Sequence, residues 1–123
     1  MTVKPNHDLS NLLDDMVYQP ERRIVLVEFY GQTCALCKFI WGQVQGMLKT
    51  LPEEDQRRID LFQIDAMATP DYAIYYGIQT IPTIILFTGG GDDIDDPIRF
   101  EKPISIPAMK EKIIEVLQWP VER

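Results

Sequence analysis

Two cysteines, Cys34 and Cys37, lie where an apolar run of the chain gives way to a helical pattern. Residues at this spacing lie one helical turn apart, with Cα atoms roughly 5–6 Å apart, which a disulfide tolerates. If the helix begins near Thr33, the Cys34 sulfur lies beside unpaired backbone N–H groups at the positive end of the helix dipole, which favour the thiolate. Cys37, one turn further in, is then shielded and placed to attack a mixed disulfide on Cys34. The spacing therefore predicts dithiol–disulfide chemistry.

Three other interpretations of the cysteine pair compete with redox chemistry. A structural disulfide explains little, because closing so short a loop stabilises by only about 2 kcal/mol and fixes nothing distant. Zinc needs about four nitrogen or sulfur ligands, and beyond the cysteines the chain offers only His7, so a second subunit or an external thiol would have to complete the site. The third interpretation is a chance spacing. Redox chemistry is favoured, and metal binding and chance stay open.

Length and charge bound the class of protein. The 123 residues predict a single domain over 1–123, and 46% of them are hydrophobic against 25% charged, so the chain can bury a core. A formal net charge of −7 argues against a nucleic-acid binder, which would show a basic face. No signal peptide or membrane span is visible. We therefore expect a cytoplasmic protein without membrane contact, and a monomer.

The hydrophobic pattern predicts alternating strands and helices. Strands are expected at residues 2–4, 24–29, 59–64, 84–87 and 98–101, and helices at about 8–16, 33–51, 71–76 and 105–117. Residues 53–58 are expected to form a solvated connection, and the acidic run 92–96 a hairpin tip rather than a calcium site. The buried face of the cysteine helix is expected to consist of Phe39, Ile40, Val44, Met47, Leu48 and Leu51.

Glu28 interrupts the apolar strand just before the cysteines. One interpretation places its side chain in solvent near the end of the strand. The other places it beneath the cysteine helix, where desolvation raises its pKa and the carboxyl group moves protons for Cys37. The residues alone leave both interpretations open.

The order of the elements and three short stretches resemble the thioredoxin family. The stretches are residues 25–30 before the cysteines, the Cys-Ala-Leu-Cys pair followed by Lys38, and Gly-Ile-Gln-Thr-Ile-Pro-Thr at 77–83 leading into a strand. The resemblance covers about residues 3–117. It implies an α/β protein with the thioredoxin fold, a central mixed β-sheet of four to five strands flanked by about four helices.

The resemblance also implies an activity. Cys34 attacks a disulfide of a protein substrate, Cys37 resolves the intermediate, and Glu28 falls where thioredoxins keep a buried aspartate, which favours its role in proton transfer. No bound cofactor is implied, and a thioredoxin reductase is a candidate for recycling the dithiol. The alternative from another class is a thioredoxin-fold adaptor whose cysteines are idle or bind a metal or an iron–sulfur cluster.

The resemblance places a substrate groove around the cysteines. In thioredoxins the proline of the Ile-Pro-Thr motif is cis and faces the active disulfide, so the Ile81-Pro82 bond is expected to be cis. The backbone of Ile81 is then expected to pair with the substrate strand. The other residues expected in the groove are Thr33, Ala35, Leu36 and Lys102.

The chain departs from the family pattern close to the cysteines. The thioredoxin Trp-Cys-Gly-Pro-Cys becomes Thr-Cys-Ala-Leu-Cys at 33–37, and Leu61 replaces the lysine that usually neighbours the buried acid. Gly42 stands where thioredoxins have a kinking proline, and Lys102 where they have a glycine. Fold and dithiol chemistry survive these changes, but partner choice, redox potential and recycling by an ordinary thioredoxin reductase do not follow.

Overall fold

The structure, a computed structural model, describes residues 24–87 and 97–118, so the elements expected at 2–4, 8–16 and 92–96 lie outside the described residues. The described elements are, in chain order, β1 (Ile24–Tyr30), α2 (Ala35–Leu48), α3 (Glu53–Gln56), β2 (Ile59–Asp65), α4 (Pro70–Tyr75), β3 (Thr83–Phe87), β4 (Ile98–Phe100) and α5 (Ile106–Leu117).

The strands form a mixed sheet in the order β2-β1-β3-β4. β1 pairs parallel with β2, and α2 lies in the crossover that joins them, whereas β1–β3 and β3–β4 are antiparallel. β1 is central, and its residues from Ile24 to Phe29 are all buried. A strand covered on both faces needs apolar residues in succession, which explains the near-continuous apolar run before the cysteines.

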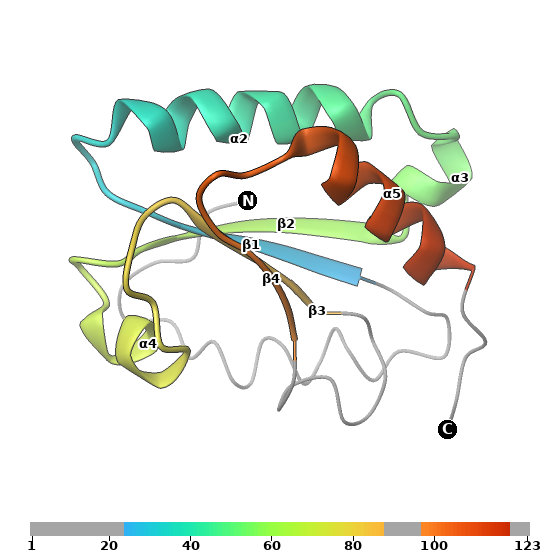
Figure 1. Cartoon of the computed structure of the whole chain (residues 1–123). Coiled ribbons are helices and arrows are strands. Elements are labelled where there is room, and N and C mark those ends of the chain that lie inside the picture. The colour runs from blue at the N-terminus through green and yellow to red at the C-terminus, as the bar shows by residue number, and fades with distance from the viewer. Residues whose placement is uncertain (1–23, 88–96, 119–123) are drawn as a thin grey trace.

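Helices cover both faces of the sheet: α2 and α5 lie on one face and α4 on the other (Figure 1). Successive side chains of β1 point to opposite faces of the sheet. Ile24 and Leu26 pack in one apolar cluster with Val44 of α2 and Ile113 of α5. The intervening residues pack in a second cluster, with Tyr76 at the end of α4. Glu28 has the parity of the first set, so it faces α2.

The buried face of α2 includes two residues that the predicted face did not list, Cys37 and Trp41, and it lacks Phe39. Its buried residues are Cys37, Ile40, Trp41, Val44, Met47 and Leu48. These follow the i, i+3, i+4, i+7 pattern of one helix face, whereas Phe39 falls off that stripe and is 62% exposed. The prediction for Phe39 is therefore wrong, and Trp41 takes a place in the core that the prediction left out.

The ends of the helices also differ from the prediction. α2 begins two residues after Thr33 and ends at Leu48, although Leu51 in the following turn is still buried. The segment expected to be only a solvated connection contains α3. Its first turn carries Glu53, Glu54 and Asp55, and acidic side chains there complement the helix dipole.

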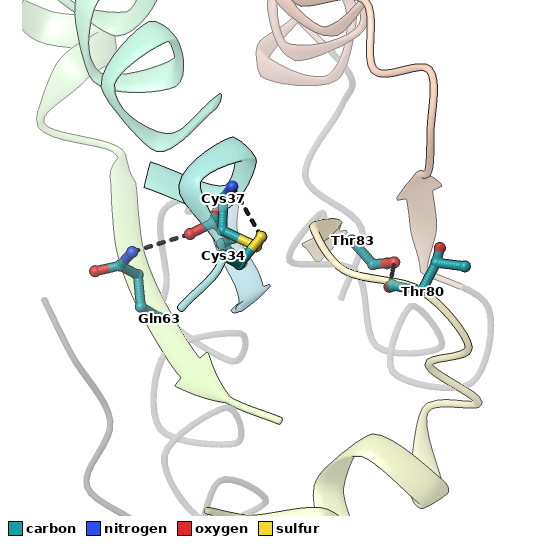
Figure 2. Close-up of a disulfide and its surroundings, with 6 residues drawn as sticks. Cys34, Cys37, Gln63, Thr80 and Thr83 are labelled. Atoms are coloured by element: carbon teal, nitrogen blue, oxygen red, sulfur yellow. Dashed lines mark hydrogen bonds between the residues drawn. A yellow bond between two sulfur atoms is a disulfide. The ribbon is translucent and has the colours of Figure 1, made fainter. Parts of the chain in front are cut away.

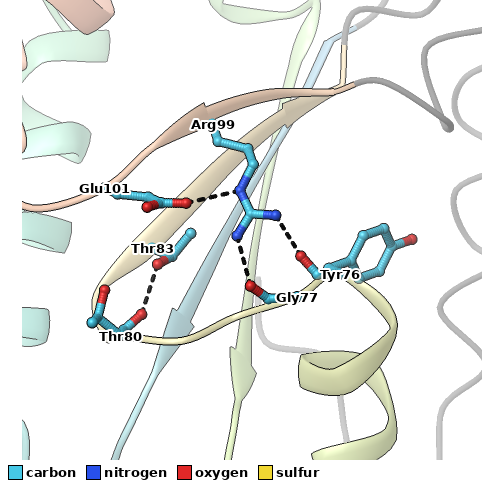
Figure 3. Close-up of polar contacts among 6 residues, drawn as sticks. All are labelled: Tyr76, Gly77, Thr80, Thr83, Arg99 and Glu101. Atoms are coloured by element: carbon cyan, nitrogen blue, oxygen red, sulfur yellow. Dashed lines mark hydrogen bonds and ion pairs between the residues drawn. The ribbon is translucent and has the colours of Figure 1, made fainter.

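Arg99 of β4 forms hydrogen bonds with the backbone at the end of α4 (Figure 3). Gly77 follows this helix with a φ of +63°, the left-handed conformation expected of a terminating glycine. The Arg99 guanidinium donates from Nη1 to the Tyr76 carbonyl, from Nη2 to the Gly77 carbonyl at 3.1 Å, and from Nε to Glu101 Oε1 at 3.0 Å. One side chain therefore holds the start of the segment that leads to Ile81-Pro82.

Replacing Arg99 with Met is expected to lower the free energy of unfolding by about 1–2 kcal/mol, because both carbonyls lose a charged donor. Urea unfolding measures the change. Glu101→Gln is the matched control: it keeps an acceptor for Nε but removes the surface ion pair, so it should cost less than about 1 kcal/mol. Equal losses in the two variants would show that the ion pair, and not the carbonyl contacts, is what matters.

Candidate active site

Cys34 and Cys37 form a disulfide at the N-terminus of α2, with Cα atoms 5.2 Å apart. Cys34 is itself the N-cap residue, and the backbone N–H of Cys37 donates to Cys34 Sγ at 3.1 Å. The sulfur thus takes the place of the oxygen of an ordinary capping side chain. The predicted turn-apart geometry is confirmed, with the helix start moved from Thr33 to Ala35.

The two cysteines differ in exposure. Cys37 is 1% exposed, because it lies on the buried stripe of α2, whereas Cys34 is only partly buried. Thr33, Ala35 and Leu36 around the pair are all exposed, Leu36 at 44%. Cys34 is therefore the more accessible of the two cysteines.

Glu28 is completely buried, so the interpretation that placed it in solvent is wrong. Its Oε1 accepts a hydrogen bond of 2.9 Å from Gln63 Nε2, and its Oε2 is buried without a partner. Burial raises the pKa of Glu28 from an ordinary value of 4.5 to about 7, and the hydrogen bond from Gln63 lowers it against that trend. A carboxyl group with this pKa can both accept and give up a proton near neutral pH.

The Ile81-Pro82 bond is cis, as the family resemblance implied. β3 pairs with β1 so that Thr83 lies opposite Phe29, and continuing this register sets Ile81 beside Gly31. A Cβ atom at Gly31 would lie 2.8 Å from Ile81 Cδ1 and 3.9 Å from Cys34 Cβ. The fold therefore brings the Ile81 side chain close to Cys34 although the two are far apart in the sequence.

The turn before β3 is closed by Thr83, whose Oγ1 donates to the Thr80 carbonyl at 2.7 Å (Figure 2). Lys102 is exposed on the segment between β4 and α5, and the Lys102-Pro103 bond is also cis, a feature that the family resemblance does not imply. That segment, the segment from α4 to β3 and the start of α2 gather at one end of the molecule, at the left of Figure 1.

Three polar residues near the cysteines were missing from the predicted site. Gln63 lies opposite Glu28 in the β1–β2 register. Gln32 donates from Nε2 to Asp65 Oδ2 at 3.1 Å. Asp65 Oδ1 accepts from the backbone N–H groups of Met67 and Ala68 in the turn that follows β2. The hydrogen bond between Gln32 and Asp65 therefore connects the segment just before Cys34 to the end of β2. The only sequence signal for Gln63 is an amide at an inward-facing position of β2, and its meaning depends on the strand register.

Comparison with known proteins decides the family. A sequence model of the family named Thioredoxin matches residues 7–109. This chain belongs to the thioredoxin family. It is 31% identical over 67 residues to a thioredoxin of Chlamydia muridarum, an alignment covering 54% of this chain and 61% of the relative, so it spans less than two thirds of that protein. It is 29% identical over 97 residues to a thioredoxin of Staphylococcus aureus, covering 79% of this chain and 82% of the relative.

The fold is that of thioredoxin as well. A thioredoxin from Nicotiana alata superimposes with a TM-score of 0.72 over 94% of this chain and 90% of the other, at 16% identity. The predicted fold class is therefore confirmed. Among the described residues, no helix is long and apolar enough to cross a membrane. The same part of the chain contains no cluster of three or more His, Cys, Asp or Glu side chains that could hold a metal ion.

Proposed function

We propose that this member of the thioredoxin family is a thiol–disulfide oxidoreductase that reduces or exchanges disulfides of protein substrates through Cys34 and Cys37. Family, fold and the CxxC pair support this chemistry. The observation that carries the proposal is the asymmetry of the pair: an accessible sulfur that accepts a backbone N–H, one turn before a buried sulfur. The first is suited to be the attacking thiolate and the second to resolve the intermediate.

The proposed reaction starts from the reduced dithiol. The Cys34 thiolate attacks a substrate disulfide, which forms a mixed disulfide and releases the first substrate thiolate. Cys37 then loses its proton to the Glu28 carboxylate and attacks Cys34 Sγ. The Cys34–Cys37 bond forms, the bond from Cys34 to the substrate breaks, and the second substrate thiolate leaves and is protonated. Two electrons pass from the dithiol to the substrate, and the chain ends in the oxidised form that the structure describes.

The substrate groove is proposed to combine two sides of the site. One side is the exposed turn of Thr33, Ala35 and Leu36. The other is the backbone of Ile81 next to Pro82, supported by the proximity of Ile81 to Gly31 and Cys34. Lys102 is exposed on the segment between β4 and α5, and it is proposed to meet the substrate at the edge of the groove.

The proposed partners are disulfide-containing proteins, with a thioredoxin reductase as the enzyme that returns the dithiol to its reduced form. A reducing cytoplasm is the proposed site of action, because it keeps such a dithiol supplied with electrons.

The direct test is reduction of insulin disulfides with dithiothreitol as the electron donor. The wild-type protein is expected to accelerate the reaction catalytically, at protein concentrations far below that of insulin. Absence of turnover, together with a bound metal or visible absorbance in protein purified without oxygen, would overturn the proposal in favour of a metal-binding adaptor.

Gly31→Ala is expected to lower insulin turnover about three- to tenfold with little loss of stability. The new Cβ would lie only 2.8 Å from Ile81 Cδ1, so the Ile81 side chain must move, and small displacements in a binding site are costly to the rate. Gly46→Ala is the matched control, because a Cβ at Gly46 of α2 meets nothing within 4 Å and alanine favours the helix. If both variants and the wild type reduce insulin at the same rate, Ile81 does not form part of the substrate groove.

A further inference from the structure

Glu28, buried beneath the cysteine helix, pairs with the half-buried Gln63 of β2. The parallel register of β1 and β2 sets them directly opposite each other. Gln63 Nε2 donates to Glu28 Oε1 at 2.9 Å, and the Gln63 side chain extends from β2 toward the side on which the cysteines lie (Figure 2). Glu28 Oε2 is the single buried side-chain oxygen or nitrogen without a hydrogen-bond partner in the described part of the chain.

Among the described residues, burial and the hydrogen bond from Gln63 are the influences on the pKa of Glu28, and no basic side chain acts on it. Its neighbour on β3 is Ile84, which is fully buried. The titratable groups that face it from the elements around it are Cys37 of α2, Asp65 at the end of β2, and Tyr30 of β1. Asp60 of β2 pairs with Val25 and so has the parity of the other face of the sheet, Lys38 of α2 is exposed, and the inward residues of α5 are apolar. Leu61 precedes Gln63 on the same face of β2. Gln63 is thus the polar contact that the described residues give this carboxyl group.

We propose that Gln63 is a positioning residue for proton transfer: by holding Oε1 of Glu28, it reserves Oε2 as the atom that takes the Cys37 proton when the mixed disulfide is resolved. This rests on the proposed function. The two oxygens of a free carboxylate are equivalent, and rotation about the last side-chain bond would exchange them. A donor fixed on one oxygen removes that freedom and leaves the other oxygen with unused acceptor capacity.

An amide suits this role because it donates a hydrogen bond without a charge. A lysine beside the carboxylate would hold it ionised, whereas an amide leaves it able to bind a proton near neutral pH. The proton leaves Cys37 Sγ for Oε2, the Cys37 thiolate attacks Cys34 Sγ, and the substrate thiolate departs. Oε2 then returns its proton to the leaving thiolate or to solvent. The carboxylate that results has the arrangement seen with the disulfide formed: Oε1 bonded to Gln63 and Oε2 without a partner.

The test compares Gln63→Leu and Gln63→Met, each alone and combined with Glu28→Gln. Two quantities are measured against pH: the rate of insulin reduction, and the ¹³C shift of the Glu28 carboxyl carbon in the reduced protein. Without the amide donor the ionised carboxylate is less stable, so the midpoints of both curves should move to higher pH by about one pH unit. The rate at neutral pH should fall about three- to tenfold and recover as the pH rises. When Glu28 is already replaced by Gln, the Gln63 substitutions should cause no further change in how the rate of insulin reduction depends on pH.

Gln43→Leu, at an exposed position of α2, is the control for loss of an amide alone and should leave both curves in place. The inference is overturned if the carboxyl titration does not move in either Gln63 variant, or if the rate profile moves equally with and without Glu28. The carboxyl titration needs no turnover, so it tests the contact even if the wild type fails to reduce insulin. That failure would count against the proposed function, whereas an unmoved titration would count against Gln63.

Discussion

Cys37→Ser is expected to stop insulin turnover and to accumulate a covalent complex with the substrate. The accessible Cys34 sulfur can still attack a substrate disulfide, but no second thiol remains to release it. Cys34→Ser should also stop turnover, yet trap almost no substrate, because the remaining sulfur of Cys37 is 1% exposed. For both variants we expect turnover to fall at least about a thousandfold, since each removes a nucleophile of the reaction.

The reactivity of the single remaining thiol provides the second half of this test. Cys34 should be alkylated by iodoacetamide at a lower pH than Cys37, because Cys34 lies at the N-cap of α2 and its sulfur accepts the Cys37 N–H. Mass spectrometry of each variant after mixing with a disulfide peptide measures the trapping. Equal alkylation at neutral pH and equal trapping would contradict the assigned roles and point to a site where both thiols serve alike, such as a metal site.

The sequence predicts those parts of the fold that depend on neighbours in the chain. β1 follows from its near-continuous apolar run, the end of α4 from Gly77, and the start of α5 from Ser105, whose side chain accepts from the Ala108 N–H. The helix of the cysteines was predicted, but not its first residue. There a sulfur supplies the cap, a role that ordinary capping preferences assign to oxygen.

The candidate site is predictable from sequence only as far as its local part. The spacing of Cys34 and Cys37 is local, and so is the interruption of β1 by Glu28. The contact of Glu28 with Gln63 spans 35 residues and exists only because the two strands pair in one register. A shift of that register by one residue would turn Gln63 to the other face of the sheet. Contacts of this kind, like that of Arg99 with the end of α4, require the fold before they can be recognised.

Glu28→Gln is expected to make the oxidised protein more stable, and increasingly so as the pH rises. The pKa of Glu28 is about 7 in the folded protein, raised by burial from 4.5, so between these values the folded state binds a proton that the unfolded state has lost. Stability that depends on this group is therefore lost as the pH rises through that interval. A neutral amide at position 28 carries no such dependence.

The expected size of this effect follows from the two pKa values. The difference in free energy of unfolding between Glu28→Gln and the wild type should grow by about 2 kcal/mol between about pH 5.5 and about pH 8.5. Urea unfolding of the oxidised proteins at several pH values measures this difference. Glu54→Gln, at an exposed position, is the control, and its difference from the wild type should stay constant.

Glu28→Gln should also slow insulin reduction, because the acceptor for the Cys37 proton is lost. If Glu28→Gln raises the free energy of unfolding but leaves the rate of insulin reduction unchanged, the buried carboxyl group destabilises the fold and takes no part in the reaction. A difference that does not change with pH would mean that Glu28 is already ionised across this range.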